Sequence, residues 1–66
     1  MSPAFKTLAT KTALSLANLS KKMFIASEEA KNSNRGEDTT HLISLSIIIS
    51  EASMKITNMI DKGTNT

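Results

Sequence analysis

The sequence predicts an all-α protein, an antiparallel two-helix hairpin that oligomerises. Two stretches of the 66-residue chain repeat apolar residues at steps of three and four, the period of one helix face. A polar segment separates them, and a short loop between two helices lays the helices side by side. So short a chain buries little core alone, and we expect association with further copies to complete it.

The first helix of the single hairpin domain (residues 1–66) is expected over residues 3–31. Ser2 is suited to cap it, and Pro3 to occupy its first position, where the missing N–H of proline costs nothing. The apolar stripe that follows is thin, because alanines and one threonine stand where a tight core would have leucine. The residues expected to pack within the chain against the second helix are Leu8, Leu16, Leu19 and Met23.

The clearest break in the chain is the segment 32–38, whose asparagines, serine and glycine favour turns. The second helix is expected over residues 39–62. Asp38 or Thr39 is the expected N-cap, and Gly63 the expected C-cap. Together with the first helix, this arrangement gives one helical hairpin.

Residues 42–60 carry more large aliphatic side chains than one neighbouring helix can cover. Ile47, Ile48 and Ile49 are consecutive, and at about 100° per residue they spread apolar surface over more than half of the helix circumference. In so short a chain, another copy of the chain is the best candidate to cover the remainder. The residues expected to form this self-assembly interface are Leu42, Leu45, Ile48, Ile49, Ala52, Ile56, Met59 and Ile60.

One alternative concerns residues 43–50, where apolar residues largely alternate with serine. This period of two, together with the isoleucines, is typical of a strand. Ile48 breaks the alternation, however, and the helical repeat continues through Met59, beyond the length of an ordinary strand. We predict a helix, and the sequence leaves open a switch of this segment to a strand.

The composition argues against catalysis. The chain has no cysteine, which excludes disulfides and thiolate metal sites. The one histidine, His41, has no nucleophile or second histidine to accompany it. Gly36 stands alone, so nothing resembles a phosphate-binding loop. We expect no enzyme activity, no metal and no cofactor.

The charge is unevenly placed along the chain. Residues 1–31 carry five lysines against two glutamates, whereas residues 32–66 carry three basic residues against four acidic ones. This bias suits segments or subunits that pack on one another, and it is too weak to indicate a nucleic-acid partner. No stretch approaches the length of a membrane span. We therefore expect the main partner to be the chain itself, in a homo-oligomer or filament.

The last half of the chain resembles the needle and pilus subunits of bacterial type III secretion systems. The matching parts are the loop NSNRGED and the pattern L-x-x-L-x-x-x-I-x-x-A-x-x-x-I-x-x-M-I-x-K-G from Leu42 to Gly63. Members of that family are short, cysteine-free helical hairpins whose C-terminal helix builds a hollow helical homopolymer. The loop here departs from many of them in having no proline. The resemblance implies secretion without a cleaved signal, a secretion chaperone for the monomer, and a place outside the cell or on its surface.

A second class of function stays open. Small helical hairpins also form dimers that modulate a transcription factor or RNA pairing, and secretion co-chaperones share the same outline. A four-helix dimer would bury the broad face of the second helix as well as a filament does. Lys-Thr-Ala-Leu at residues 11–14 is similar to the opening of the plasmid copy-number hairpin that binds RNA. Such a protein would act in the bacterial cytoplasm.

Overall fold

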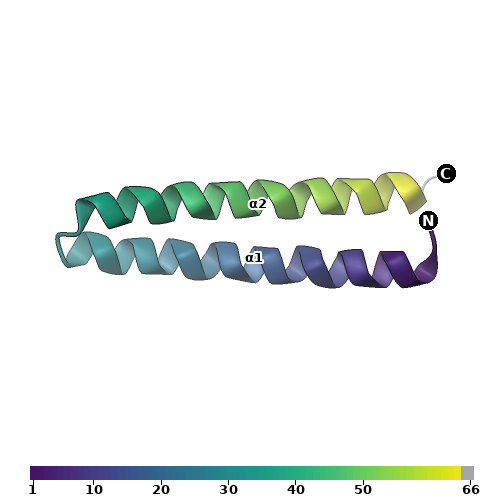
Figure 1. Cartoon of the computed structure of the whole chain (residues 1–66), viewed down its shortest axis with the longest axis horizontal. Coiled ribbons are helices and arrows are strands. Elements are labelled where there is room, and N and C mark those ends of the chain that lie inside the picture. Colours follow the sequence, from purple (N-terminus) through teal and green to yellow (C-terminus); the bar gives the residue numbers. More distant parts are fainter. Residues whose placement is uncertain (65–66) are drawn as a thin grey trace.

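The computed structural model describes residues 1–64 as two long helices, α1 (Pro3–Asn32) and α2 (Gly36–Thr64). The helices lie side by side and antiparallel along their whole length, with the turn at one end and both termini at the other (Figure 1). Residues 43–50 are helical throughout. The predicted fold class, an all-α helical hairpin, is confirmed.

The first helix starts as the sequence predicts. The amide of Phe5 donates a hydrogen bond to Ser2 Oγ at 3.2 Å, and Pro3 occupies the first helical position. The helix closes into the turn through the amide of Arg35, which donates to the carbonyl of Ala30 at 2.9 Å. Between these two residues Asn34 has a φ of 59°, in the left-handed region that asparagine tolerates better than most residues.

The second helix begins earlier than predicted. The carbonyl of Arg35 accepts hydrogen bonds from the Thr39 amide at 2.9 Å and from the Thr39 hydroxyl at 3.0 Å. These bonds to the Arg35 carbonyl start the helix, so α2 begins directly after Arg35. Asp38 and Thr39 therefore lie in the first turn, where the charge of Asp38 suits the helix dipole, and neither of them is the N-cap.

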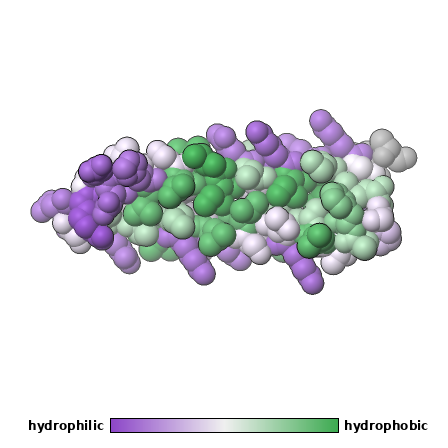
Figure 2. All heavy atoms as spheres, in the orientation of Figure 1, coloured by the Kyte–Doolittle hydropathy of each residue, from purple (hydrophilic) through white to green (hydrophobic). Residues whose placement is uncertain are grey.

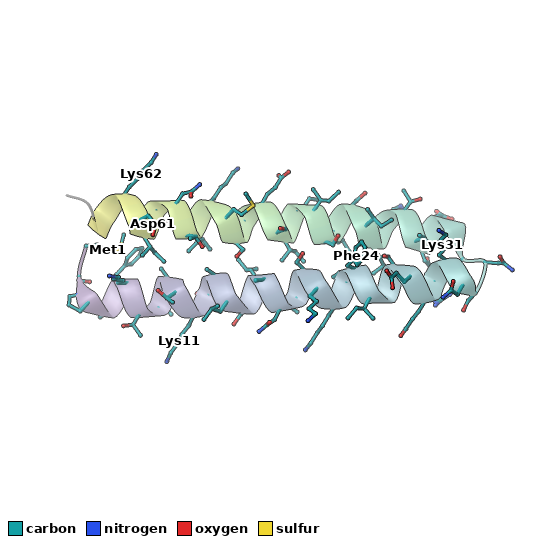
Figure 3. All side chains as sticks on the ribbon, turned by 180° about the vertical axis from the view of Figure 1, so that it is seen from behind. Met1, Lys11, Phe24, Lys31, Asp61 and Lys62 are labelled. Carbon is teal, nitrogen blue, oxygen red and sulfur yellow. The ribbon has the colours of Figure 1, made fainter. Side chains whose placement is uncertain are left out.

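The second helix also ends later than predicted. It continues through Gly63 to Thr64, and Gly63 has no positive φ, so this glycine does not end the helix as a C-cap. The side chain of Met1 lies across Gly63, since a Cβ atom built there would come within 2.8 Å of Met1 Cε. The N-terminal methionine thus covers the open end of the hairpin (Figure 3).

The two helices meet along a seam that repeats every seven residues, the repeat of a coiled coil. Every residue of the seam is buried or half-buried, and small side chains are interspersed among the larger apolar ones. On α1 the seam consists of Ala9, Ala13, Leu16, Ser20, Met23, Ser27 and Ala30, and on α2 of Thr39, Leu42, Ser46, Ile49, Ser53, Ile56, Ile60 and Gly63.

Two hydrogen bonds across the seam fix how the helices align. The hydroxyl of Ser20 donates to the carbonyl of Ser46 at 2.8 Å, and the hydroxyl of Ser53 donates to the carbonyl of Ala13 at 2.9 Å. In both pairs the residue numbers add up to 66, so residue n of α1 lies opposite residue 66 − n of α2. A side-chain hydroxyl reaches the other backbone only because the seam residues are small.

The hairpin buries very little apolar side-chain surface between its helices. Among the described residues the buried apolar side chains are all alanines, Ala9, Ala13 and Ala30, and no large side chain is fully buried. The accessible surface is 4996 Å², whereas a compact protein of this mass exposes about 4,100 Å². The radius of gyration is 15.0 Å, against about 11 Å for a compact chain of this length.

A first prediction tests the seam. Ser46→Leu should lower the stability of the hairpin by about 1–3 kcal/mol, because a leucine overfills the narrow space at a buried seam position. Ser44→Leu is the matched control, since Ser44 is exposed on the same helix. Thermal unfolding followed by circular dichroism at fixed protein concentration measures both. Equal melting temperatures for the two variants would contradict the close approach of the helices at Ser46.

A second prediction tests the turn. Asn34→Val should cost about 1–2 kcal/mol, because a β-branched residue is strained at positive φ. Asn34→Gly should be at least as stable as the native chain, because glycine adopts this conformation freely. Urea unfolding of the two variants measures the difference. If valine were tolerated as well as glycine, the turn would not have this backbone conformation.

Candidate assembly faces

The hairpin is a slab with extents of 49 × 15 × 11 Å, and both of its broad faces are apolar. Positions on either side of the seam in the seven-residue repeat project to one broad face or to the other. We call the face seen in Figures 1 and 2 the front face and the face seen in Figure 3 the rear face. Large apolar residues, each between 39% and 64% exposed, lie on both: Phe5, Leu8, Leu19, Leu45, Ile48 and Met59 in front, and Leu14, Phe24, Ile43, Ile47 and Met54 at the rear.

Apolar side chains gather over the middle of the front face. Figure 2 shows them across both helices, while hydrophilic side chains cluster at the turn end and project from the long edges. The charged residues nearest the apolar patch are lysines, Lys22 on α1 and Lys55 and Lys62 on α2, by their places in the seven-residue repeat. The front face is therefore an apolar strip with basic margins.

The rear face combines a groove with a protruding aromatic side chain. The groove has a volume of about 400 Å³ and exists because small residues of the two helices lie opposite one another there. Phe24 lies on the same face but nearer the turn, and Lys31 and Asp61 lie towards its two ends (Figure 3). The residues that line the groove are Thr10, Ala13, Leu14, Ala17, Ser53, Thr57, Ile60 and Asp61.

The residues predicted for self-assembly divide between the seam and the front face. Leu42, Ile49, Ile56 and Ile60 are half-buried in the seam, and Ala52 is half-buried beside it. The three that remain exposed on the front face are Leu45, Ile48 and Met59. The predicted stripe mixed two neighbouring positions of the repeat, one facing α1 and one facing outwards. That the exposed residues contact another chain stays a prediction.

The structure separates the four predicted intrachain partners on α1 by their burial. Leu16 and Met23 lie in the seam, but Leu8 is 64% exposed and Leu19 is 42% exposed, so these two leucines do not pack between the helices. The stripe that meets α2 also contains alanines and serines, and Leu8 and Leu19 lie beside it on the front face. A seven-residue repeat of small residues, Ala13, Ser20 and Ser27 on α1 and Ser46 and Ser53 on α2, was the signal that could have located the seam. The rear face, with Phe24 and its groove, was missed altogether.

Polar chemistry is sparse in the part of the chain that the structure describes. One ion pair is present there, between Arg35 Nη1 and Asp38 Oδ2 at 3.7 Å, and both side chains are more than half exposed, so it contributes little stability. No group of His, Asp and Glu side chains within residues 1–64 has the arrangement of a metal site, and His41 lies exposed on α2. The broad faces are therefore the candidate functional surfaces.

The second helix is long and apolar enough, by length and composition alone, to cross a membrane over Gly36–Gly63. The prediction that no stretch approaches such a length is therefore wrong. In the hairpin, however, Lys21 and Lys22 lie opposite residues 44–45, about a third of the way along that segment. Each ammonium group held near the centre of a bilayer costs about 2.5 kcal/mol or more. The closed hairpin is thus poorly suited to span a membrane.

Comparison with known proteins adds no relative. No family model, no curated protein and no solved structure matches the chain. The resemblance to needle and pilus subunits accordingly stays a prediction from the pattern of residues 42–63, and the candidate function rests on the two apolar faces.

Proposed function

We propose that this protein is a self-assembling structural subunit whose apolar faces are covered by further copies of the same chain. The observation that supports this function is the distribution of apolar side chains. Thirteen large ones are exposed among the described residues, while the buried apolar residues are three alanines. A folded chain that keeps its largest apolar side chains outside gains its main hydrophobic stabilisation by association.

The size of the faces fits an interface between subunits. A face of 49 by 15 Å offers on the order of 700 Å², close to the roughly 800 Å² that each partner buries in a standard stable interface. Both faces are apolar, so one subunit has room for two neighbours. A closed dimer through one face would leave the other exposed to water, whereas continued growth buries both.

A hollow helical homopolymer is the form that the resemblance to type III needle and pilus subunits implies for such growth. In that form a chaperone would hold the monomer before export, and the polymer would stand at the cell surface. This part of the proposal rests on the pattern of residues 42–63 alone. The compact alternative, a four-helix dimer that modulates a transcription factor or RNA pairing, is less favoured because it leaves one apolar face uncovered.

The proposed function is tested by negative-stain electron microscopy of the purified protein over a concentration series, with light scattering alongside. We expect extended particles whose mass grows with concentration, because both faces accept a neighbour. A protein that stays monomeric over the whole series would contradict self-assembly. A single discrete dimer would favour the compact alternative.

A third prediction concerns the front face. Ile48→Asp should abolish extended assembly, because an interface there would bury an unpaired carboxylate, yet it should leave the hairpin folded, since Ile48 is 61% exposed. Ser44→Asp, on the outer edge of the same helix, is the control and should assemble normally. Circular dichroism checks folding, and size-exclusion chromatography with light scattering measures assembly. Normal assembly of the Ile48→Asp variant would remove the front face from the interface.

A further inference from the structure

We propose that the rear face pairs with the rear face of a second copy in a two-fold, antiparallel dimer, with Phe24 of each copy seated in the groove of the other. This inference rests on the proposed self-assembly, and it specifies which face forms the basic contact and in what orientation. Three features of the rear face, its shape, its charge and its apolar surface, place the two-fold axis near the same point.

The first feature is shape. The alignment of the helices places the groove residues opposite or at positions 5–17 of α1, centred near residue 11. Phe24 lies on the other side of the middle of the face (Figure 3). A half-turn about an axis near residues 17–18 therefore exchanges Phe24 with the centre of the groove. A groove of about 400 Å³ has room for the ring, since a cavity of about 150 Å³ holds benzene.

The second feature is charge. Asp61 lies opposite residue 5 of α1, so the point midway between Asp61 and Lys31 is near residue 18. The same half-turn brings Lys31 of each copy level with Asp61 of the other, diagonally across the interface, so that two crossed ion pairs form. Among the described residues the only ion pair within the hairpin joins Arg35 and Asp38, so neither Lys31 nor Asp61 is in an ion pair with another of these residues.

The third feature is the apolar surface itself. Projected onto α1 by the same alignment, the five large apolar residues of the rear face are centred near residue 18. The half-turn then lays Met54 of one copy on Ile43 of the other. It lays the aliphatic stem of Lys21 over Leu14 while the ammonium group stays in water. Ala17 lies at the axis, where a small side chain permits close approach of the two copies.

Other pairings are less favourable. A parallel pair of rear faces sets Lys31 against Lys31 and Phe24 against Phe24, and it leaves the two grooves facing each other. The front face has its apolar centre near residue 13, and an antiparallel pair centred there sets Lys22 of one copy against Lys62 of the other. Like charges opposed in this way disfavour both arrangements. The antiparallel rear-face dimer avoids such contacts.

The orientation is tested by cysteine cross-linking. Because the native chain has no cysteine, the introduced cysteine is the only thiol that can cross-link. The Ile48→Asp background removes growth through the front face and leaves the rear-face dimer. In it, Ala17→Cys should form a cross-linked dimer under mild oxidation, because the two Ala17 positions meet at the axis. Thr10→Cys should not, because its copies lie about 22 Å apart along the helices, at 1.5 Å per residue. Equal cross-linking of both variants, or of neither, would overturn the antiparallel dimer.

The contacts are tested by the dimer dissociation constant in the same background, measured by analytical ultracentrifugation. Phe24→Ala should weaken the dimer about tenfold or more, whereas Phe5→Ala, which changes the front face, should not. Lys31→Glu should weaken the dimer about tenfold, and Lys22→Glu, which makes the same change in net charge on the front face, is its control. Adding Asp61→Lys to Lys31→Glu should restore the dimer.

The outcomes separate this inference from the proposed function. If the Ile48→Asp protein is monomeric while the native protein assembles, the rear-face dimer is overturned and self-assembly stands. If a dimer forms but its dissociation constant is unchanged by Phe24→Ala and by the charge reversals, its interface is not the one proposed. If the native protein never associates, both proposals fail.

Discussion

The narrow seam between the two helices is the constraint on which the rest of the structure depends. Alanines and serines recur along it, and they bring the backbones close enough for Ser20 and Ser53 to bond across the gap. The seam holds only five of the chain's leucine, isoleucine and phenylalanine side chains, all of them half-buried, and most of the others lie on the two broad faces. The slab shape, the missing core and the exposed apolar surface therefore have one cause. Because association stabilises the folded state by mass action, the stability of such a hairpin is tied to its own concentration.

Two serines of the seam, Ser20 and Ser53, also give the hairpin a fixed register. A slip of one helix along the other would take their hydroxyls away from the carbonyls that they bind across the seam, and an unsatisfied buried polar group costs about 1–3 kcal/mol. An all-leucine seam would pack more apolar surface but would specify the register less strictly. Register matters here because the groove is shared between the helices, and Lys31 and Asp61 belong to different ones. Shape and charge on the rear face match a second copy only in this alignment.

The sequence predicted the two helices, the cap at Ser2 and the antiparallel arrangement, because these depend on local chemistry and on a strong period. It did not predict which stripe of α1 contacts α2, since large and small residues both repeat at helical spacing, and Leu8 and Leu19 repeat beside the true seam. The true seam shows only when the Ala and Ser repeats of both helices are compared. The early start of α2 was missed because a carbonyl, that of Arg35, and no side chain, defines it. The groove could not be predicted from the sequence, because its shape depends on the register between the helices.

The orientation of the first contact decides what kind of polymer the chain can build. A contact between two rear faces is isologous, and a filament made by joining such dimers through their front faces has identical ends. A contact of one front face with the next rear face is heterologous, and it orients every subunit alike and gives a polar filament. The rear face favours the isologous contact, because the groove and the aromatic ring that fits it lie on the same face of the same chain. A polar needle would require side chains of the front face to fill that groove. The front face carries lysines around its apolar strip, whereas Lys31 of the rear face needs an acidic partner.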